Sequence, residues 1–419
     1  MKVAMVTQPG DEVIPGIGGY SSIAIIAYHL ARGLARLGYE VIFYGKQSQT
    51  RPAVERDQEG IVYRRISLKP EELSLKPLRL LDRLGAFRNP QRPLFASSLY
   101  YPWYALQIAR DLQEKQPDII HIMNFSQYVP LMRAFHPKAK FVLHMECEWL
   151  SQLDAALIER RLQQTDLVVG CSEYITNKIR RRFPAHARRC QTVFNGVDLT
   201  QFTDNNGNQA VPKAAGKRLL FSGRISPEKG LHVLLDAFSQ VSQHYPDAQL
   251  AIAGAVSIAP QKYIVNLSDE ATVRALATFY QGADYLTQLK AKLSPDLMDS
   301  VAFLGFVPHP QLAEHYRRAD VLINPSLSEA FGMSLVEAMA VETPVVAARV
   351  GGMIDIVEDG KTGILTEPGN AAALAAGITS ILANPALGRA MGEAGQQRVR
   401  ALFTWEQVTR TLDQAYRTL

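Results

Sequence analysis

The sequence predicts an α/β protein of two doubly wound domains, residues 1–203 and 204–404, in which helices cover both faces of parallel sheets. Three observations support this prediction. The 419 residues exceed what one ordinary hydrophobic core accommodates. Short apolar stretches alternate with amphipathic stretches in both halves, which is typical of parallel strands joined by crossover helices. A polar stretch rich in small residues, 204–217, separates the two series and is typical of a linker.

Short apolar stretches that end in turn residues mark the predicted strands of the first half. The chain begins with one of them, residues 1–7, and the next segment, 20–37, has apolar side chains close to the 3.6-residue period of a helix. The segment 51–102 is apolar and basic with many breaks, and it receives no assignment. Further predicted strands are residues 39–45, 117–124, 139–146 and 165–172.

The second half repeats this alternation. The stretch 254–300 is assigned to two helices, and residues 405–419 are predicted to form an amphipathic final helix. Because ligands of open α/β sheets bind at the carboxyl ends of the strands, functional residues are expected in the loops that follow them. The predicted strands are residues 217–223, 248–254, 300–306, 319–325, 343–348 and 362–368.

The loop and helix that follow residue 325 give the strongest functional signal. Residues 335–340 are good helix formers, which makes Gly332, Met333 and Ser334 the first helical turn. Amides of a first turn lack partners within the helix and lie at the positive end of its dipole, so they bind phosphate readily. Gly332 also lets a ligand approach the backbone closely.

Two glutamates flank this helix start. Glu329 precedes the helix, where its carboxylate can accept hydrogen bonds from sugar hydroxyls. Glu337 lies inside the helix, where it would repel a diphosphate but can accept hydrogen bonds from a ribose diol. For either residue alone, a commoner alternative stays open: Glu329 complements the helix dipole, and Glu337 faces water.

A second motif surrounds a turn between a strand and a helix. The strand is expected to end at Gly223, and Pro227 is expected to open the next helix. Arg224 and Lys229 flank the turn, and a guanidinium and an ammonium both suit a diphosphate. Since a helix start disfavours cations, this position favours a ligand over the alternative of two solvated cations.

Two histidines and a glycine-rich loop mark the first half. His121 and His144 lie near the ends of predicted strands, where a core histidine is the alternative to a functional one. The glycines of residues 16–19 follow the first strand, but they do not form a complete dinucleotide fingerprint.

The segment 328–365, SEAFGMSLVEAMAVETPVVAARVGGMIDIVEDGKTGIL, resembles the donor-site signature of glycosyltransferase family 4, the retaining GT-B enzymes. It departs from the family pattern at Glu342 and Thr343, where a small residue or glycine is usual before Pro344. The resemblance covers nearly the whole chain and implies the GT-B fold: two Rossmann-like domains that face each other across a cleft. It also implies that residues 405–419 return to complete the first domain.

The resemblance implies roles for individual residues of the second domain. Arg224 and Lys229 would clamp the nucleotide diphosphate as catalytic residues. Glu329, also catalytic, would hold donor-sugar hydroxyls, and Glu337 would hold the ribose. Further substrate-binding positions that it implies are Phe306 and Val307 beside the base, and Phe331, Gly332, Met333, Ser334 and Leu335 at the helix start.

In the first domain, the resemblance implies that the loop with Gly18 and Gly19 approaches the donor diphosphate or the acceptor. His144 would contact the donor sugar or the acceptor near the reacting carbon and counts as a catalytic residue. His121 corresponds to a more structural position.

The implied function is retaining transfer of a hexose from a nucleotide diphosphate sugar to an acceptor hydroxyl. A UDP-sugar is favoured over a GDP-sugar, and a glycan, a lipid-linked intermediate or a small molecule can be the acceptor. No cofactor and no metal are expected, because cations and helix amides can meet the diphosphate charge and no Asp-x-Asp signature occurs. A GT-B sugar-nucleotide epimerase and a non-catalytic sugar-nucleotide-binding partner stay open as alternatives.

Composition sets limits on partners and compartment. A net charge of +5 does not argue for nucleic acid, although it is compatible with peripheral contact with an anionic membrane surface. No stretch approaches the length of a membrane span. The three cysteines have no paired spacing, which favours reduced thiols in a cytoplasmic protein. The net charge is compatible with peripheral contact of this protein at the inner face of the membrane.

Overall fold

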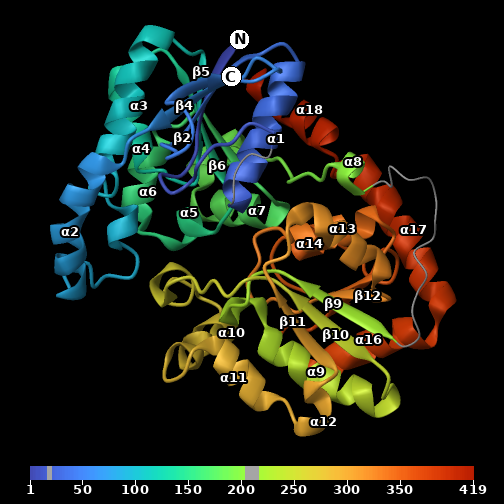
Figure 1. The fold of residues 1–419 in the computed structure, drawn as a ribbon. Coiled ribbons are helices and arrows are strands. Elements are labelled where there is room, and N and C mark those ends of the chain that lie inside the picture. Colours follow the sequence, from blue (N-terminus) through green and yellow to red (C-terminus); the bar gives the residue numbers. More distant parts are fainter. Residues whose placement is uncertain (17–20, 203–216) are drawn as a thin grey trace. The chain divides into compact units, whose positions relative to one another are not determined.

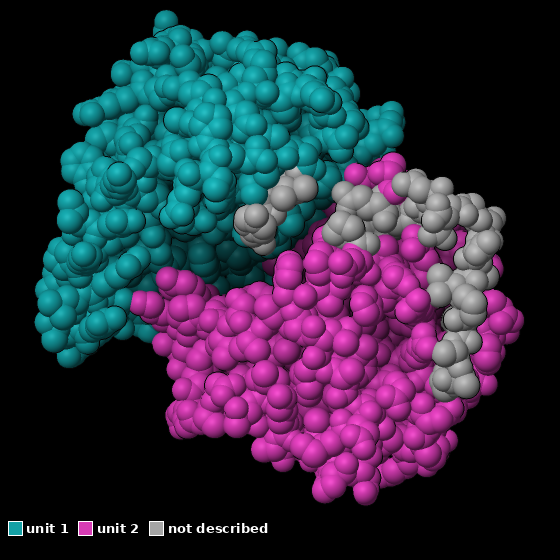
Figure 2. All heavy atoms as spheres, in the orientation of Figure 1, with its two compact units in different colours: residues 1–195, 405–419 teal, residues 196–404 magenta. Residues whose placement is uncertain are grey.

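A computed structural model of the protein describes residues 1–16, 21–202 and 217–419. These residues form two compact units, unit 1 (residues 1–195 and 405–419) and unit 2 (residues 196–404) (Figure 2). Each unit contains one sheet with helices packed on it, which confirms the predicted doubly wound α/β fold (Figure 1).

The sheet of unit 1 has the strand order β3-β4-β2-β1-β5-β6-β7-β8. Its neighbours pair in parallel, except that the edge strand β3 runs antiparallel to β4. The strands are β1 (Lys2–Val6), β2 (Glu40–Lys46), β3 (Val54–Arg56), β4 (Val62–Ile66), β5 (Ile119–Met123), β6 (Lys140–Met145), β7 (Leu167–Gly170) and β8 (Cys190–Thr192).

Helices α1 (Ser22–Arg36) and α18 (Trp405–Tyr416) cover one face of this sheet, and α3 (Pro102–Lys115) and α4 (Tyr128–Phe135) cover the other (Figure 1). Alternate residues of a strand point to opposite faces. On β1, Val3 and Met5 accordingly join the buried cluster that contains the apolar residues of α1 and α18. The end of the chain therefore belongs to unit 1.

Unit 1 gives way to unit 2 at Asn195, ahead of the predicted boundary at residue 203. The reason is a local pairing: Val197 forms a parallel bridge with Thr404, and its N–H donates to the carbonyl of Phe403 at 2.7 Å. The short helix α8 (Leu199–Phe202) packs near helices of unit 2. The two chain connections between the units therefore run next to each other.

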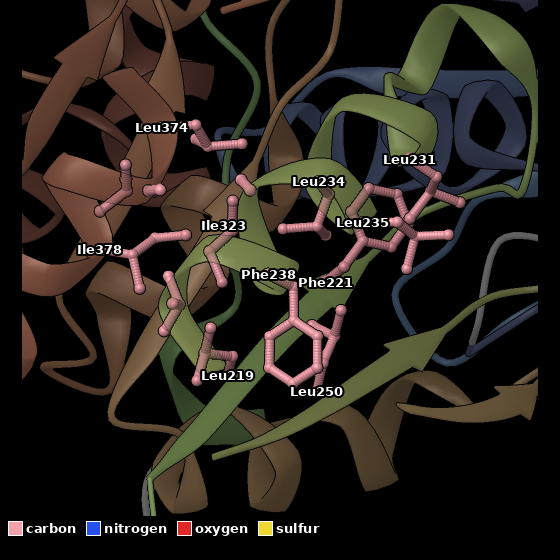
Figure 3. Close-up of a cluster of buried hydrophobic side chains, with 14 of the residues drawn as sticks. Leu219, Phe221, Leu231, Leu234, Leu235, Phe238, Leu250, Ile323, Leu374 and Ile378 are labelled. Atoms are coloured by element: carbon pink, nitrogen blue, oxygen red, sulfur yellow. The ribbon is translucent and has the colours of Figure 1, made fainter. Parts of the chain in front are cut away.

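The sheet of unit 2 is parallel, with the order β11-β10-β9-β12-β13-β14. Helices α9 (Leu231–His244) and α16 (Ala371–Ala383) bury their apolar sides against one face, where Phe221, Phe238 and Ile378 meet (Figure 3). Helices α13 (His309–Arg318) and α14 (Met333–Ala340) lie on the other face (Figure 1). The strands are β9 (Arg218–Ser222), β10 (Gln249–Ala253), β11 (Val301–Gly305), β12 (Val321–Asn324), β13 (Val345–Ala348) and β14 (Ile364–Thr366).

Two segments differ from the prediction. The unassigned segment 51–102 contains β3, β4 and the helix α2 (Lys69–Arg83). The stretch 254–300 was predicted as two helices but has only one of eight residues, α11 (Tyr285–Lys292), among shorter helical turns. In both segments much of the apolar surface stays outside the main cores, so the sequence pattern lacks a clear period.

A smaller difference concerns Pro227, which opens a 3-10 turn that ends at Lys229, whereas α9 starts at Leu231. Within the described ranges, no single helix is long and apolar enough to cross a bilayer. Only α16 taken together with α17 (Pro385–Leu402) reaches that length and composition, and the two are bent by 101°.

Candidate functional site

Three loops of unit 2 converge because two glycines let their backbones touch. A Cβ atom on Gly230, which ends the turn after β9, would lie 2.1 Å from the carbonyl oxygen of Pro325 after β12. A Cβ atom on Gly351, after β13, would lie 1.7 Å from the carbonyl oxygen of Glu329. Both glycines also have positive φ, 69° and 56°, which other residues adopt only with strain. The loops at the carboxyl ends of β9, β12 and β13 therefore meet.

Lys229 and Glu329 form an ion pair at this junction. The Nζ atom of Lys229 lies 2.6 Å from Oε2 of Glu329, and both side chains are largely shielded from solvent. The hydroxyl of Ser326 lies 3.5 Å from the same carboxylate oxygen. The structure thus joins two predicted site residues that are 100 positions apart, one suited to phosphate and the other to hydroxyl groups.

Arg224 lies in the same turn as Lys229 but remains more accessible, with 45% of its side chain exposed. Its guanidinium donates to Oε1 of Glu228 at 2.9 Å and to the carbonyl of Ser257 at 3.0 Å. These two acceptors fix the orientation of the guanidinium and leave part of its donor fork for an anion.

Glu228 is a site residue that the sequence analysis missed. It is only 2% exposed, Oε1 also accepts a hydrogen bond from the hydroxyl of Ser226 at 2.6 Å, and Oε2 is buried without a hydrogen-bond partner among the described residues. Burial, followed by the charge of Glu228, raises the pKa of Tyr280 to about 12. The available signal was an acid four residues after Arg224 in the same turn.

Glu337 is buried on α14, so the alternative that it faces water is wrong. Its Oε2 atom accepts a hydrogen bond from the hydroxyl of Tyr316 at 2.6 Å, and Oε1 lies 2.8 Å from Nε2 of His309. The hydrogen bond to Glu337 raises the pKa of His309 above its ordinary value. Two side chains from α13 therefore hold this carboxylate in place.

The His309–Glu337 pair gives a prediction about pH. Because the pKa of His309 is raised in the folded protein, the pair stabilises unit 2 fully below the ordinary pKa of histidine, about 6.5, and loses this effect as pH rises through the folded pKa. The difference in melting temperature between the wild type and His309→Asn should therefore shrink as pH is raised from about 6 to about 8. A difference that is constant with pH would contradict the charged pair.

The helix start is formed as predicted. Helix α14 begins at Met333, and Gly332 caps it with φ 117°. The amides of Met333 and Ser334 therefore lie in the first turn, where an intrahelical partner is lacking. Phe331 and Leu335 are buried in the core, so their side chains are not presented to a ligand, and the N–H of Leu335 already donates to the carbonyl of Gly332 at 3.0 Å.

The end of β11 presents an unusual aromatic. Phe306 follows this strand and is 73% exposed, and Val307 is half-buried beside it. A large apolar side chain in water has no stabilising partner, so this position suits a planar ligand as the resemblance implies.

In unit 1, the predicted residue His144 is fully buried within a chain of polar groups. Its Nδ1 atom lies 3.1 Å from Nε2 of His121, whose Nδ1 lies 2.5 Å from the hydroxyl of Tyr416 on α18. On its other side, Nε2 of His144 lies 3.2 Å from Oε1 of Glu146, and Asn195 donates to Oε2 of Glu146 at 2.7 Å. The approach of Nε2 to Glu146 lacks hydrogen-bond geometry, so Nε2 of His144 and Oε1 of Glu146 are both buried without a hydrogen-bond partner among the described residues.

The direction of the hydrogen bonds along this row of polar groups follows from the two groups at its ends, Tyr416 and Glu146. Burial, followed by the charge of His144, lowers the pKa of His121, so the ring of His121 is neutral and carries one N–H. If Tyr416 donates to His121, then His121 donates to His144, and the N–H of His144 faces Glu146. In the reverse order, a His144 ring without a proton on Nε2 would turn its lone pair toward that carboxylate, so the first order is favoured.

Tyr416→Phe should therefore destabilise unit 1 by about 1–3 kcal/mol, because Nδ1 of buried His121 would lose its partner. Urea unfolding followed by circular dichroism measures this loss. Tyr39→Phe is the matched control, since the hydroxyl of Tyr39 meets Asp413, which is also bound to Arg417. Equal stability of the two variants would contradict the assigned chain.

Two predicted glycines and a possible metal site remain. Gly18 and Gly19 lie outside the described residues. Among residues 1–16, 21–202 and 217–419, no three His, Cys, Asp or Glu side chains are grouped so that they could hold a metal ion.

Comparisons with known proteins show which families and structures this chain is similar to. Residues 204–398 match the family described as glycosyl transferases group 1, and residues 23–201 match glycosyltransferase family 4. A D-inositol 3-phosphate glycosyltransferase of Kribbella flavida is 29% identical over 439 aligned positions, which cover 100% of this chain and 95% of that protein.

Two solved structures share the fold. The sucrose-phosphate synthase of Thermosynechococcus elongatus has a TM-score of 0.73 at 24% identity, and the match covers 100% of this chain and 98% of that one. The Anabaena protein HepE in complex with UDP-glucose has a TM-score of 0.68 at 18% identity and covers 100% of both chains.

Proposed function

This chain belongs to glycosyltransferase family 4 and is a glycosyltransferase with the GT-B fold, and on that premise we propose that it transfers a hexose with retention. The donor in this proposal is a nucleotide diphosphate sugar, and the acceptor is a hydroxyl group of a glycan, a lipid-linked intermediate or a small molecule. The observation that carries the proposal is the ion pair of Lys229 and Glu329 beside the start of α14.

The diphosphate is assigned to the positive groups of unit 2. Arg224 offers a guanidinium that is fixed in orientation and partly exposed, and Lys229, further along the same loop, offers a point charge. The first-turn amides of α14 add donors that point out of the helix. These groups meet the charge that develops on the departing diphosphate, so the proposed transfer needs no metal ion and no other cofactor.

The sugar and the ribose are assigned to the two carboxylates. When a diphosphate attracts Lys229, the carboxylate of Glu329 becomes available to accept hydrogen bonds from hydroxyls of the transferred hexose. Glu337 is held by Tyr316 and His309, and each of its oxygens keeps a lone pair for the ribose diol. Phe306 and Val307 lie at the end of β11 for the base.

A UDP-sugar is the proposed donor. The Anabaena structure, which has the same fold, is named as a complex with UDP-glucose, and this supports uridine over guanosine. The Kribbella relative is named for a phosphorylated inositol, which adds a small anionic polyol to the candidate acceptors. Location in the cytoplasm, and contact of the chain with a membrane, stay predictions at this point.

A thermal-shift panel of nucleotides and nucleotide sugars tests the donor site. UDP and one UDP-sugar should raise the melting temperature, since a ligand at about 100 times its Kd adds about 2.7 kcal/mol to the stability. The shift should be the same with EDTA. A shift that EDTA abolishes would overturn the metal-free site, and the absence of a shift with every nucleotide would overturn the donor site.

Product analysis separates the two alternatives. A sugar-nucleotide epimerase would convert the donor without any acceptor, and a non-catalytic partner would bind the nucleotide sugar and release no UDP. Transfer of the hexose only in the presence of a hydroxyl acceptor, with the anomeric configuration retained, is the expected result.

A further inference from the structure

Helix α2 presents a stripe of leucines to solvent. Leu73, Leu80, Leu81 and Leu84 are 74%, 57%, 47% and 68% exposed. Single exposed leucines are ordinary, but a contiguous apolar patch on one helix marks an interaction surface. Helix α2 belongs to unit 1 and runs beside α3 (Figure 1).

The opposite side of the helix is what attaches it to unit 1. Glu71 and Leu75 are buried, and Oε1 of Glu71 accepts a hydrogen bond from the backbone N–H of Tyr104 at 2.6 Å. At 100° per residue these positions lie opposite Leu73, Leu80 and Leu84. The outward leucines therefore cannot turn inward without breaking this attachment.

Basic side chains border the stripe. Lys76, Arg79 and Arg83 are exposed, and one exposed carboxylate, that of Glu72, lies on the same side of the helix. Lys76 and Arg83 project within about 100° of the leucines, and two further exposed cations, Lys69 and Arg88, lie at the ends of the helix. Long basic side chains can extend their charged heads past an apolar surface.

We propose that α2 binds an anionic lipid surface, with its leucines in the interfacial region and its basic residues against the headgroups. An amphipathic helix of this kind lies in the plane of the interface. The charges favour this occupant over a second copy of the chain, because pairing two such helices would bring like charges together. The inference concerns a surface apart from the donor site and does not depend on the proposed transfer reaction.

Co-sedimentation with vesicles tests the proposal. The full chain should bind vesicles of phosphatidylcholine mixed with phosphatidylglycerol, and it should bind pure phosphatidylcholine far more weakly. The triple variant Lys76→Ala/Arg79→Ala/Arg83→Ala should bind the anionic vesicles about 100-fold more weakly. Leu80→Ser/Leu84→Ser should bind them about ten-fold more weakly.

Two matched controls make the test specific to α2. The charge control is Arg181→Ala/Arg182→Ala/Arg188→Ala, which removes the same charge from exposed positions at the end of α7 (Glu173–Arg182) and in the turn after it. The apolar control is Ile354→Ser, which removes an exposed aliphatic side chain from unit 2. Both should bind as the wild type does. All variants should keep the wild-type melting temperature and the wild-type stabilisation by UDP.

Three outcomes would overturn the proposal. The first is equal binding to neutral and anionic vesicles, or to neither. The second is an equal loss in the arginine control, which would assign the binding to net charge alone. The third is that light scattering shows a dimer, and that Leu80→Ser/Leu84→Ser converts it to a monomer but binds vesicles as the wild type does. This result would assign the leucine stripe to contact with a second copy of the chain.

Discussion

Lys229→Ala is expected to lower the rate of UDP release from the donor sugar by about 10³-fold. The substitution removes the cation that lies 2.6 Å from Glu329, so a diphosphate would meet an uncompensated and partly shielded carboxylate instead of a neutral pair. Arg224→Ala is expected to cost less, about 10²-fold, because this side chain is more exposed and its loss leaves Glu228 with the hydroxyl of Ser226. Release of UDP in the presence of an acceptor is the measurement.

The double variant Lys229→Ala/Glu329→Ala sharpens this test. If the two residues act as one unit, the double variant loses much less than the product of the two single losses. Lys361→Ala is the matched control, since Lys361 also pairs with a glutamate of unit 2, Glu358, at 2.8 Å but lies far more in solvent. Wild-type turnover in Lys229→Ala would show that the diphosphate is not bound at this junction.

The buried strands were predictable because their sequences are nearly continuous apolar runs. β5 (Ile119–Met123) and β13 (Val345–Ala348), for example, are buried along their whole length, so their side chains leave no ambiguity of face. The edge strand β3 and its neighbour β4 carry polar and charged residues, and α2 exposes leucines and contains Pro77, so none of these three segments matches a buried pattern.

The candidate site was predictable only where a residue type and a local turn coincide. Arg224, Lys229, Glu329 and Glu337 stand within strand–turn–helix segments, whose ends supply amides and gather side chains. The groups that hold such side chains come from distant segments: Tyr416 reaches His121 across 295 positions. A single sequence carries no signal for such a pairing, and only the packing of α18 on the first sheet creates it.

Gly351→Ala is expected to lower turnover by about 10²-fold, although residue 351 supplies no side chain to the site. The new Cβ atom would lie 1.7 Å from the carbonyl oxygen of Glu329, a backbone atom that cannot rotate away. The same carbonyl accepts a hydrogen bond from the N–H of Gly352 at 3.1 Å. The loops must therefore separate, which moves the carboxylate of Glu329 away from Lys229.

Gly360→Ala provides a control that shares the backbone strain but not the clash. Gly360 has φ 75° and open space around its Cβ position, so alanine there should cost about 1–2 kcal/mol and leave turnover unchanged. Gly351→Ala should lower the melting temperature further and should also weaken binding of UDP-sugar more than binding of UDP, because Glu329 is assigned to the hexose. If both variants keep full turnover, the close approach at Gly351 does not position Glu329, and the proposed contact of that carboxylate with the sugar fails with it.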